Sequence, residues 1–339
     1  MFHSFDTSEP IVHRLVPQWQ AGVPLVGRAQ VDADAALRWG VERVDTLLST
    51  FFSGSFPSME VAWGIEDDPA PNACVWGHAS PSVVLLTSGA IREIAATRAR
   101  LAKPAATIAS KYAFPAAMAS ENDADERAQA LAQAGENLGV FALAALFAHE
   151  VGHVHDRQFE DIPVARTGRL GQAHEIAADT WAIRACTELA VSWARSLADR
   201  LQVPLEFLLR SALYYVVVGH GLVDDVDWSV PWSPHDPATH PPGALRLAAS
   251  AVAVSEWLAD RRVLSEQAAS EMAVEVFAAA AQTLYWLRTS KELPHMVFQQ
   301  LFLDLLAEGD VIDRMRATYE RFRAALPLSP DSQSAPADA

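Results

Sequence analysis

Two histidines and one glutamate within a short apolar segment have the types and the spacing needed for metal chemistry. Residues 141–156 read FALAALFAHEVGHVHD and place His149, Glu150 and His153 in the pattern H-E-x-x-H. The apolar, Ala-rich start predicts a buried helix, on which residues four positions apart lie on one face. The pattern therefore predicts a zinc site with two histidine ligands and Glu150 as general base. A helix with two histidines in a polar seam remains the alternative.

A third zinc ligand is expected, because catalytic zinc usually has three protein ligands and one open position for water. Glu175 is the best candidate, at the start of a second predicted helix that reads HEIAAD at residues 174–179. Asp179, one turn later, could hold the outer nitrogen of a ligand histidine. His155 and His174 are rival ligands that would point elsewhere, and an ordinary acidic helix start would also explain Glu175.

The first half of the chain is expected to hold the strands and the metal-binding helix. Residues 1–30 carry little pattern and are interpreted as an extended lead-in. Apolar periodicity and β-branched runs predict a helix over 31–49, capped by Asp32 or Asp34, and strands within 58–87. The Ala-rich insert over 98–138 is expected to form a helix, a mobile loop and a second helix. The strand over 82–87 is bounded by Pro81 and Gly89. The metal-binding helix should run from about 125 to about 155.

The second half is expected to be helical, with one long loop. The predicted segments are a loop over 158–171, helices over 172–200 and from Pro204, a loop over 219–242, helices over 243–259, 264–289 and 295–325, and a disordered tail over 326–339. The predicted fold class is mainly α with a small β-sheet, an α+β fold. A catalytic domain over 31–258 would carry a C-terminal helical part, 259–325, packed on it.

Composition limits the classes of partner. The net charge of −16 disfavours nucleic-acid binding, which needs clustered Lys and Arg. Cys74 and Cys186 form no disulfide framework, so a reducing, cytoplasmic setting fits. The N-terminus lacks the pattern of a signal peptide, and the longest apolar segments are too short to span a bilayer. No membrane insertion is therefore expected, and the oligomeric state stays open.

Four motifs in order resemble the gluzincin zinc metallopeptidases, especially the M48 group. The first two are HEVGH and E-x-x-A-D, at residues 149–153 and 175–179. Members also carry an N-A segment, a Gly, an apolar strand and T-x-G, matched here by Asn72-Ala73, Gly77, residues 83–86 and Thr87-Ser88-Gly89. The fourth motif, H-P-x-x-x-x-R, corresponds to residues 240–246. Together they span about half of the chain, which lacks the transmembrane helices of the membrane members.

The resemblance implies a zincin-type domain and a role for each matching residue at the metal. His149, His153 and Glu175 would bind one zinc ion per chain, with Glu150 as the base. Asp179 would orient a ligand histidine. His240 and Arg246 would lie near the zinc, where either could stabilise the oxyanion, or His240 could close the site.

The resemblance also implies how a substrate is bound. The strand around residues 82–87 would be the sheet edge to which a protein or peptide substrate adds as a strand. Asn72, Val83 and Leu85 would contact it. The expected function is a zinc-dependent endopeptidase. A gated or non-catalytic zinc-containing binding protein is the alternative, with the 219–242 loop, His240 or the 98–138 insert as the cover.

Overall fold

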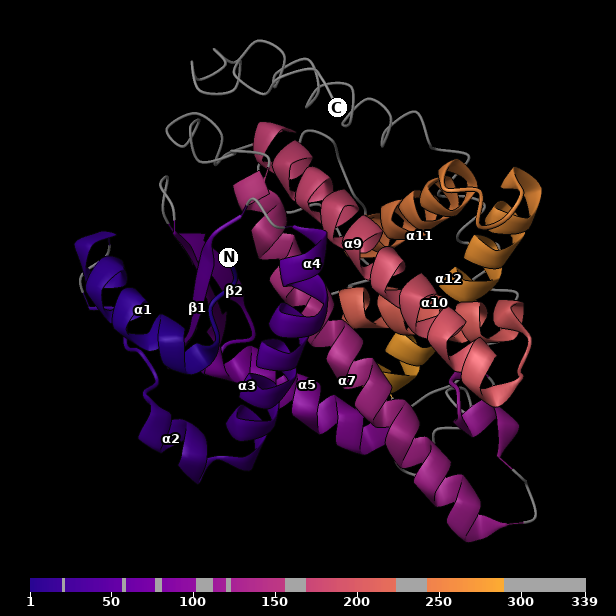
Figure 1. The fold of residues 1–339 in the computed structure, drawn as a ribbon, viewed down its shortest axis with the longest axis horizontal. Helices are drawn as coiled ribbons and strands as arrows, with labels where there is room; N and C mark the ends of the chain where they lie inside the picture. Colours follow the sequence, from indigo (N-terminus) through magenta and orange to yellow (C-terminus); the bar gives the residue numbers. More distant parts are fainter. Residues whose placement is uncertain are drawn as a thin grey trace.

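The computed structural model describes residues 1–19, 22–56, 59–76, 81–101, 112–119, 123–155, 169–223 and 243–289. These residues form a mainly helical protein with one small sheet (Figure 1). The helices are α1 Phe5–Trp19, α2 Arg28–Ala33, α3 Ala35–Leu47 with a π-helical turn Leu48–Phe52, α4 Ser53–Ser55, α5 Ser88–Leu101, α7 Ala124–His155, α9 Arg169–Leu201, α10 Leu205–Val223, α11 Gly243–Asp260 and α12 Glu266–Thr289, with a 3₁₀ turn at Ala116–Met118. The strands are β1 Val61–Glu66, β2 Ala73–Trp76 and β3 Ser82–Thr87. The mainly α class with a small sheet is confirmed.

The sheet has the order β1-β3-β2, so the strand predicted as the edge is the central one. β3 pairs parallel with β1 and antiparallel with β2. All six β3 residues are buried, because helices cover both faces of the sheet. Val83 and Leu85 pack with Val12 and Val16 of α1 on one face. The alternate residues of β3 join the main core, which includes α3, α5 and α7.

The segment predicted as an extended lead-in covers the outer edge of β1 and contains a helix. Only its ends pair with the strand, through bridges of Phe2 with Val61 and of Leu25 with Glu66. Between these ends α1 packs on the sheet, and the Ser8 hydroxyl accepts a hydrogen bond from the Trp63 N–H, 3.1 Å. The prediction that residues 1–30 are extended was therefore wrong. Among the described strands, β2 is left as the edge without such a cover.

The helix that carries H-E-x-x-H, α7, passes through the middle of the molecule (Figure 1). It begins where the carboxylate of Asp123 accepts hydrogen bonds from the N–H groups of Asp125 and Glu126, at 3.0 and 2.9 Å. Its apolar half is surrounded by other elements. By length and composition α7 could cross a membrane, yet 72% of its most apolar window is buried inside the protein, as in a core helix.

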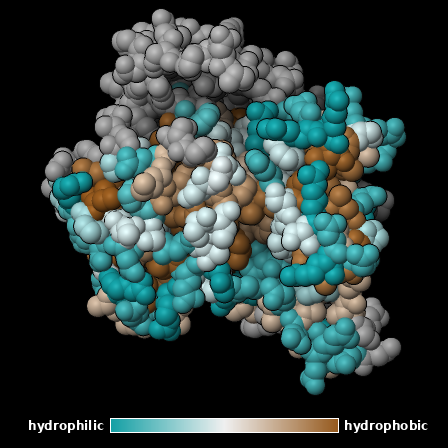
Figure 2. Space-filling model, viewed as in Figure 1, coloured by the Kyte–Doolittle hydropathy of each residue, from teal (hydrophilic) through white to brown (hydrophobic). Residues whose placement is uncertain are grey.

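Helices α9 and α10 pack against α7, α11 packs against α9 and α10, and α12 packs against α10 and α11, in one continuous core. α9 and α11 are followed by residues with positive φ, Gln202 and Arg262, a common way for helices to end. α3 is capped as predicted by Asp34, whose side chain accepts from the N–H groups of Ala36 and Leu37. On the face shown in Figure 2, hydrophilic side chains gather mainly around the periphery, and hydrophobic residues show in the centre between them.

The predicted loop over 219–242 starts too early, because α10 continues to Val223. Gly219 and Gly221 are helical, and both lie where a side chain would collide with a neighbour. A Cβ on Gly219 would lie 2.8 Å from the backbone N of Ala142, and one on Gly221 would lie 2.4 Å from Cδ1 of Leu284. These glycines allow close helix packing and do not end the helix. Residues 224–242, the helix predicted over 295–325 and the tail over 326–339 lie outside the described residues.

Candidate metal centre

Three side chains from two helices bring their metal-binding atoms together. His149 and His153 of α7 approach through their Nε2 atoms, 3.1 Å apart. Glu175 of α9 lies with one carboxylate oxygen 3.3 Å from Nε2 of His149 and the other 3.9 Å from Nε2 of His153. Ligands bound to one tetrahedral zinc at 2.0–2.1 Å are about 3.3 Å apart. The spacing of these atoms therefore suits a zinc ion.

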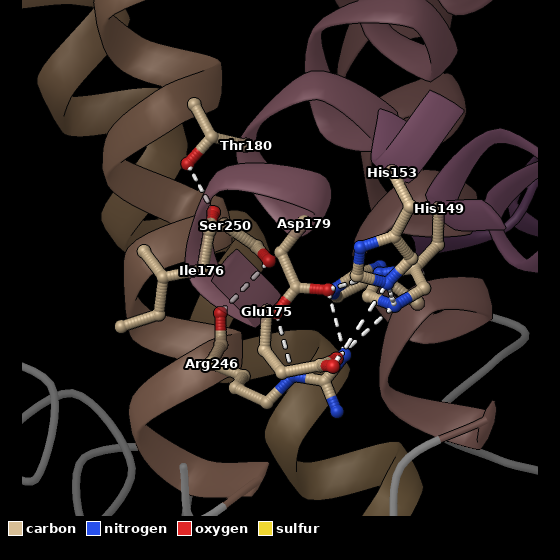
Figure 3. Close-up of polar contacts among 9 residues, drawn as sticks. His149, His153, Glu175, Ile176, Asp179, Thr180, Arg246 and Ser250 are labelled. Carbon is tan, nitrogen blue, oxygen red and sulfur yellow. Dashed lines mark hydrogen bonds and ion pairs between the residues drawn. The ribbon is translucent and has the colours of Figure 1, made fainter. Parts of the chain in front are cut away.

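Asp179 holds the other ring nitrogen of His149, as the sequence predicted (Figure 3). Its Oδ1 lies 2.8 Å from Nδ1 of His149. A carboxylate only accepts hydrogen bonds, so Nδ1 carries the proton and Nε2 faces the cluster. Asp179 itself is nearly fully buried. This contact fixes the orientation of the ring that a metal would need.

Arg246 lies at the site and contacts Asp179, and its predicted part in stabilising an oxyanion stays a prediction. Its Nε donates to Oδ2 of Asp179 at 2.5 Å and its Nη2 to Oδ1 at 2.7 Å. The pair is buried, and such a two-point contact restrains the carboxylate strongly. The geometry favours a positioning role for this arginine.

Opposite charges keep the two carboxylates of the site ionised. Burial raises the pKa of Glu175, but the hydrogen bond with His149 and the charges of His153, His149 and Arg246 lower it to about 2. Burial also raises the pKa of Asp179, and Arg246 and His220 outweigh this to hold it well below its ordinary value. Burial lowers the pKa of His149, while hydrogen bonds with Asp179 and Glu175 raise it well above the ordinary value. Both carboxylates are thus ionised, beside a cationic arginine and a histidine whose protonated form is favoured.

Glu150 is buried beside the two imidazoles. The potential ligand atoms of His149, Glu150 and His153 all lie within 4.8 Å of one another. Glu150 stands next to His149 in sequence, so its side chain leaves α7 in another direction from the two histidines. Its predicted role as a base stays a prediction.

The two rival ligands lie less favourably. His155 is exposed, with its ring 5.5 Å from that of Trp181. His174 is buried one position before Glu175 and therefore leaves α9 on a different face. His240 lies outside the described residues, so its predicted position near the metal stays a prediction.

Two of the three predicted substrate contacts are wrong. Val83 and Leu85 are fully buried on the central strand and face α1. Asn72 is exposed just before the edge strand β2, where its backbone carbonyl accepts from the Thr87 N–H at 3.0 Å. The edge strand that packs against α7, the helix with the H-E-x-x-H pattern, is β2. Burial and, second, the nearby charge of the Glu150 carboxylate raise the pKa of the Cys74 thiol on β2 to about 12.

His220 of α10 is a site residue that the sequence reasoning missed. Its Nε2 lies 3.3 Å from Oδ1 of Asp179, and the side chain is almost completely buried. In the sequence it falls in the segment taken for a loop. An uninterrupted apolar run from Leu213 to Val218 was the signal that the helix could continue past Gly219.

Comparisons with known proteins add no assignment. The chain matches no family model, and comparison with curated proteins and with solved structures gave no significant match.

Proposed function

We propose that this chain is a zinc-dependent endopeptidase of the gluzincin type, acting on a protein or peptide substrate. The observation that carries the proposal is the convergence of Nε2 of His149, Nε2 of His153 and the carboxylate of Glu175 at distances of 3.1–3.9 Å. The donor set of two imidazoles and one carboxylate fits zinc, and Asp179 behind His149 is the expected support. The chain would hold one ion.

The buried glutamate next to the ligands favours catalysis over a purely structural metal site. Bound zinc supplies a water of lowered pKa and polarises a substrate carbonyl. Glu150 would take a proton from that water and pass it to the leaving amine. A structural zinc site has four protein ligands and needs no such base. Arg246 would keep Asp179, and through it His149, in place during turnover.

No other described strand pairs with the outer side of β2, which suggests a binding mode for an extended peptide. The N–H of Thr87 donates to the carbonyl of Asn72, so by the alternation of an antiparallel pair Cys74 also bonds to β3. Val75 then directs its N–H and C=O away from β3. A peptide adding at β2 would use these groups.

The chain has two free cysteines, Cys74 and Cys186, which agrees with a cytoplasmic setting.

The test compares wild-type protein with Glu150→Gln. We expect the variant to bind one zinc ion with unchanged affinity and to lose peptide-bond cleavage by at least about 100-fold. New protein termini would be detected by mass spectrometry in cells producing each form. Termini found only with the wild type would support a peptidase, and their flanking residues would define the specificity.

Two outcomes would reject the proposal. Equal cleavage by Glu150→Gln would exclude the proposed base. Zinc binding without any wild-type-dependent termini would favour the alternative, a non-catalytic or gated zinc protein. Exposed Glu93→Gln on α5 serves as a control that should change neither zinc binding nor cleavage.

A further inference from the structure

The carboxylate of Asp179 is the point where four helices meet. α9 supplies the carboxylate, α7 supplies Nδ1 of His149 at 2.8 Å, and α11 supplies Nε and Nη2 of Arg246 at 2.5 and 2.7 Å. The fourth helix, α10, brings Nε2 of His220 to within 3.3 Å of Oδ1. Side chains from three other helices thus lie around the carboxylate that is predicted to orient a zinc ligand.

His220 is an unusual side chain for its surroundings. It is 3% exposed and follows Val216, Val217 and Val218, which are fully buried. Among the described residues its Nε2 makes no hydrogen bond of good geometry, and burying such a group costs about 1–3 kcal/mol. A leucine would fill the same space without that cost. Packing alone therefore does not explain a histidine at this position.

The two glycines beside His220 determine how near it comes to Asp179. Gly219 lets the backbone of α10 approach that of α7, since its Cβ would lie 2.8 Å from the N of Ala142. Gly221 makes room for Leu284 of α12 on the other side. The histidine between them is held in a narrow position between helices. The local sequence Gly-His-Gly thus presents one imidazole to the carboxylate.

We infer that His220 is a positioning residue of the proposed metal centre, which with Arg246 holds Asp179 against Nδ1 of His149. The inference rests on the proposed function, because it concerns the same centre. The terminal torsion of an aspartate is soft, and Arg246 restrains the carboxylate from α11 alone, whereas His220 adds a group beside Oδ1 from α10. Rotation would carry Oδ1 away from His149 and release the ring. His220 beside Oδ1 limits that rotation and keeps Nε2 of His149 directed at the metal.

The experiment measures metal binding in three variants. His220→Leu removes the polar nitrogen at similar volume, and His220→Gln keeps an N–H donor at a similar distance along the side chain. Thr283→Val is the matched control, because Thr283 is a buried hydroxyl whose partner, Tyr214 at 2.8 Å, lies on the same helix as His220. Zinc affinity would be measured by competition with a chelator, and ligand geometry by the visible spectrum of the cobalt-substituted protein.

We expect His220→Leu to weaken zinc binding by about 10-fold and to change the cobalt spectrum. His220→Gln should stay within about 3-fold of the wild type, and Thr283→Val should lower thermal stability without changing zinc affinity. Wild-type zinc affinity and an unchanged cobalt spectrum in His220→Leu would overturn the inference and leave the proposed function standing. Absence of zinc binding by the wild type would overturn both.

Discussion

The approach of two imidazole nitrogens to 3.1 Å is the most informative contact at the residue scale. Asp179 accepts at Nδ1 of His149, so without a second proton on the ring Nε2 carries a lone pair. Two lone pairs at that distance repel. The contact is favourable only with a proton or a cation between the nitrogens. The nearby carboxylate of Glu175 would stabilise the positive charge of either one. A shared proton or a bound cation would each satisfy this arrangement, and the proposed function assigns it to a cation.

Loss of the carboxylate ligand should weaken the site strongly. Glu175→Ala leaves two histidines, and we expect zinc affinity to fall by at least about 100-fold, more than is usual for a supporting residue. Calorimetric titration with zinc would measure it. Glu188→Ala, farther along α9, is the control and should bind as the wild type does. Unchanged affinity and stoichiometry in Glu175→Ala would exclude Glu175 as a ligand.

The sequence predicted the residues of the site that share a helix, and missed contacts that depend on tertiary packing. The spacings within α7 and α9 place His149 with His153 and Glu175 with Asp179, because helical periodicity fixes them. The contacts of His220 and Arg246 with Asp179 depend on how α10 and α11 pack, which no local pattern encodes. Only the resemblance predicted that Arg246 lies near the metal, and it did not predict the contact with Asp179.

At the scale of elements, Glu136 joins α7 to α3 and α5. Its carboxylate accepts from Nε of Arg43 at 2.6 Å and from Nε1 of Trp39 at 3.0 Å, both on α3. Nη1 of Arg98 on α5 donates at 2.7 Å. Burial raises the pKa of Glu136, but these hydrogen bonds outweigh it and hold the pKa below its ordinary value of 4.5. The ionised form is thus the one that stabilises the fold.

This lowered pKa predicts a pH-dependent effect of Glu136→Gln. Stability from this carboxylate is fully present above the unfolded pKa and is lost as pH falls through the folded pKa. We expect the variant to be about 1–3 kcal/mol less stable near pH 7, with the difference shrinking below about pH 4. Urea unfolding across this range would measure it. A difference that is constant with pH, or equal to that of exposed Glu93→Gln, would contradict the assignment.

Close packing of α10 on α7 predicts the sign of a second substitution. Alanine normally stabilises a helix by about 1 kcal/mol relative to glycine. In Gly219→Ala the new Cβ would meet the α7 backbone at 2.8 Å, so we expect a loss of about 1–3 kcal/mol. Gly54→Ala, with no atom within 4 Å of its Cβ, is the control. Thermal unfolding would show the difference, and stabilisation by Gly219→Ala would contradict it.

Errors in the predicted fold share one physical cause. An apolar run such as that of β3 is equally consistent with a central strand and with a covered edge, because periodicity does not encode strand order. Glycines such as Gly219 are read locally as helix ends, although here a tertiary contact requires them. The long helices α7, α9 and α12 were predicted because their apolar periodicity extends over many turns.

On the scale of the whole molecule, the metal would join the two longest described helices, α7 and α9. A ligand that binds only the folded state stabilises it by about 4 kcal/mol at 1,000 times its dissociation constant. We expect removal of zinc by a chelator to lower the melting temperature by about 5–10 °C. Scanning fluorimetry at several free zinc concentrations would measure this. Glu175→Ala should show no such shift, and a zinc-independent wild type would contradict the prediction.

The cover over β1 has a consequence for self-association. A bare strand edge can pair with a like edge of another copy. The bridges of Phe2 and Leu25 occupy β1, so within the described sheet such pairing could use only β2. A second copy and a peptide would then compete for the same backbone groups of Val75. Under the proposed peptide binding at β2, dimers formed through the sheet would be inactive, and substrate would dissociate them.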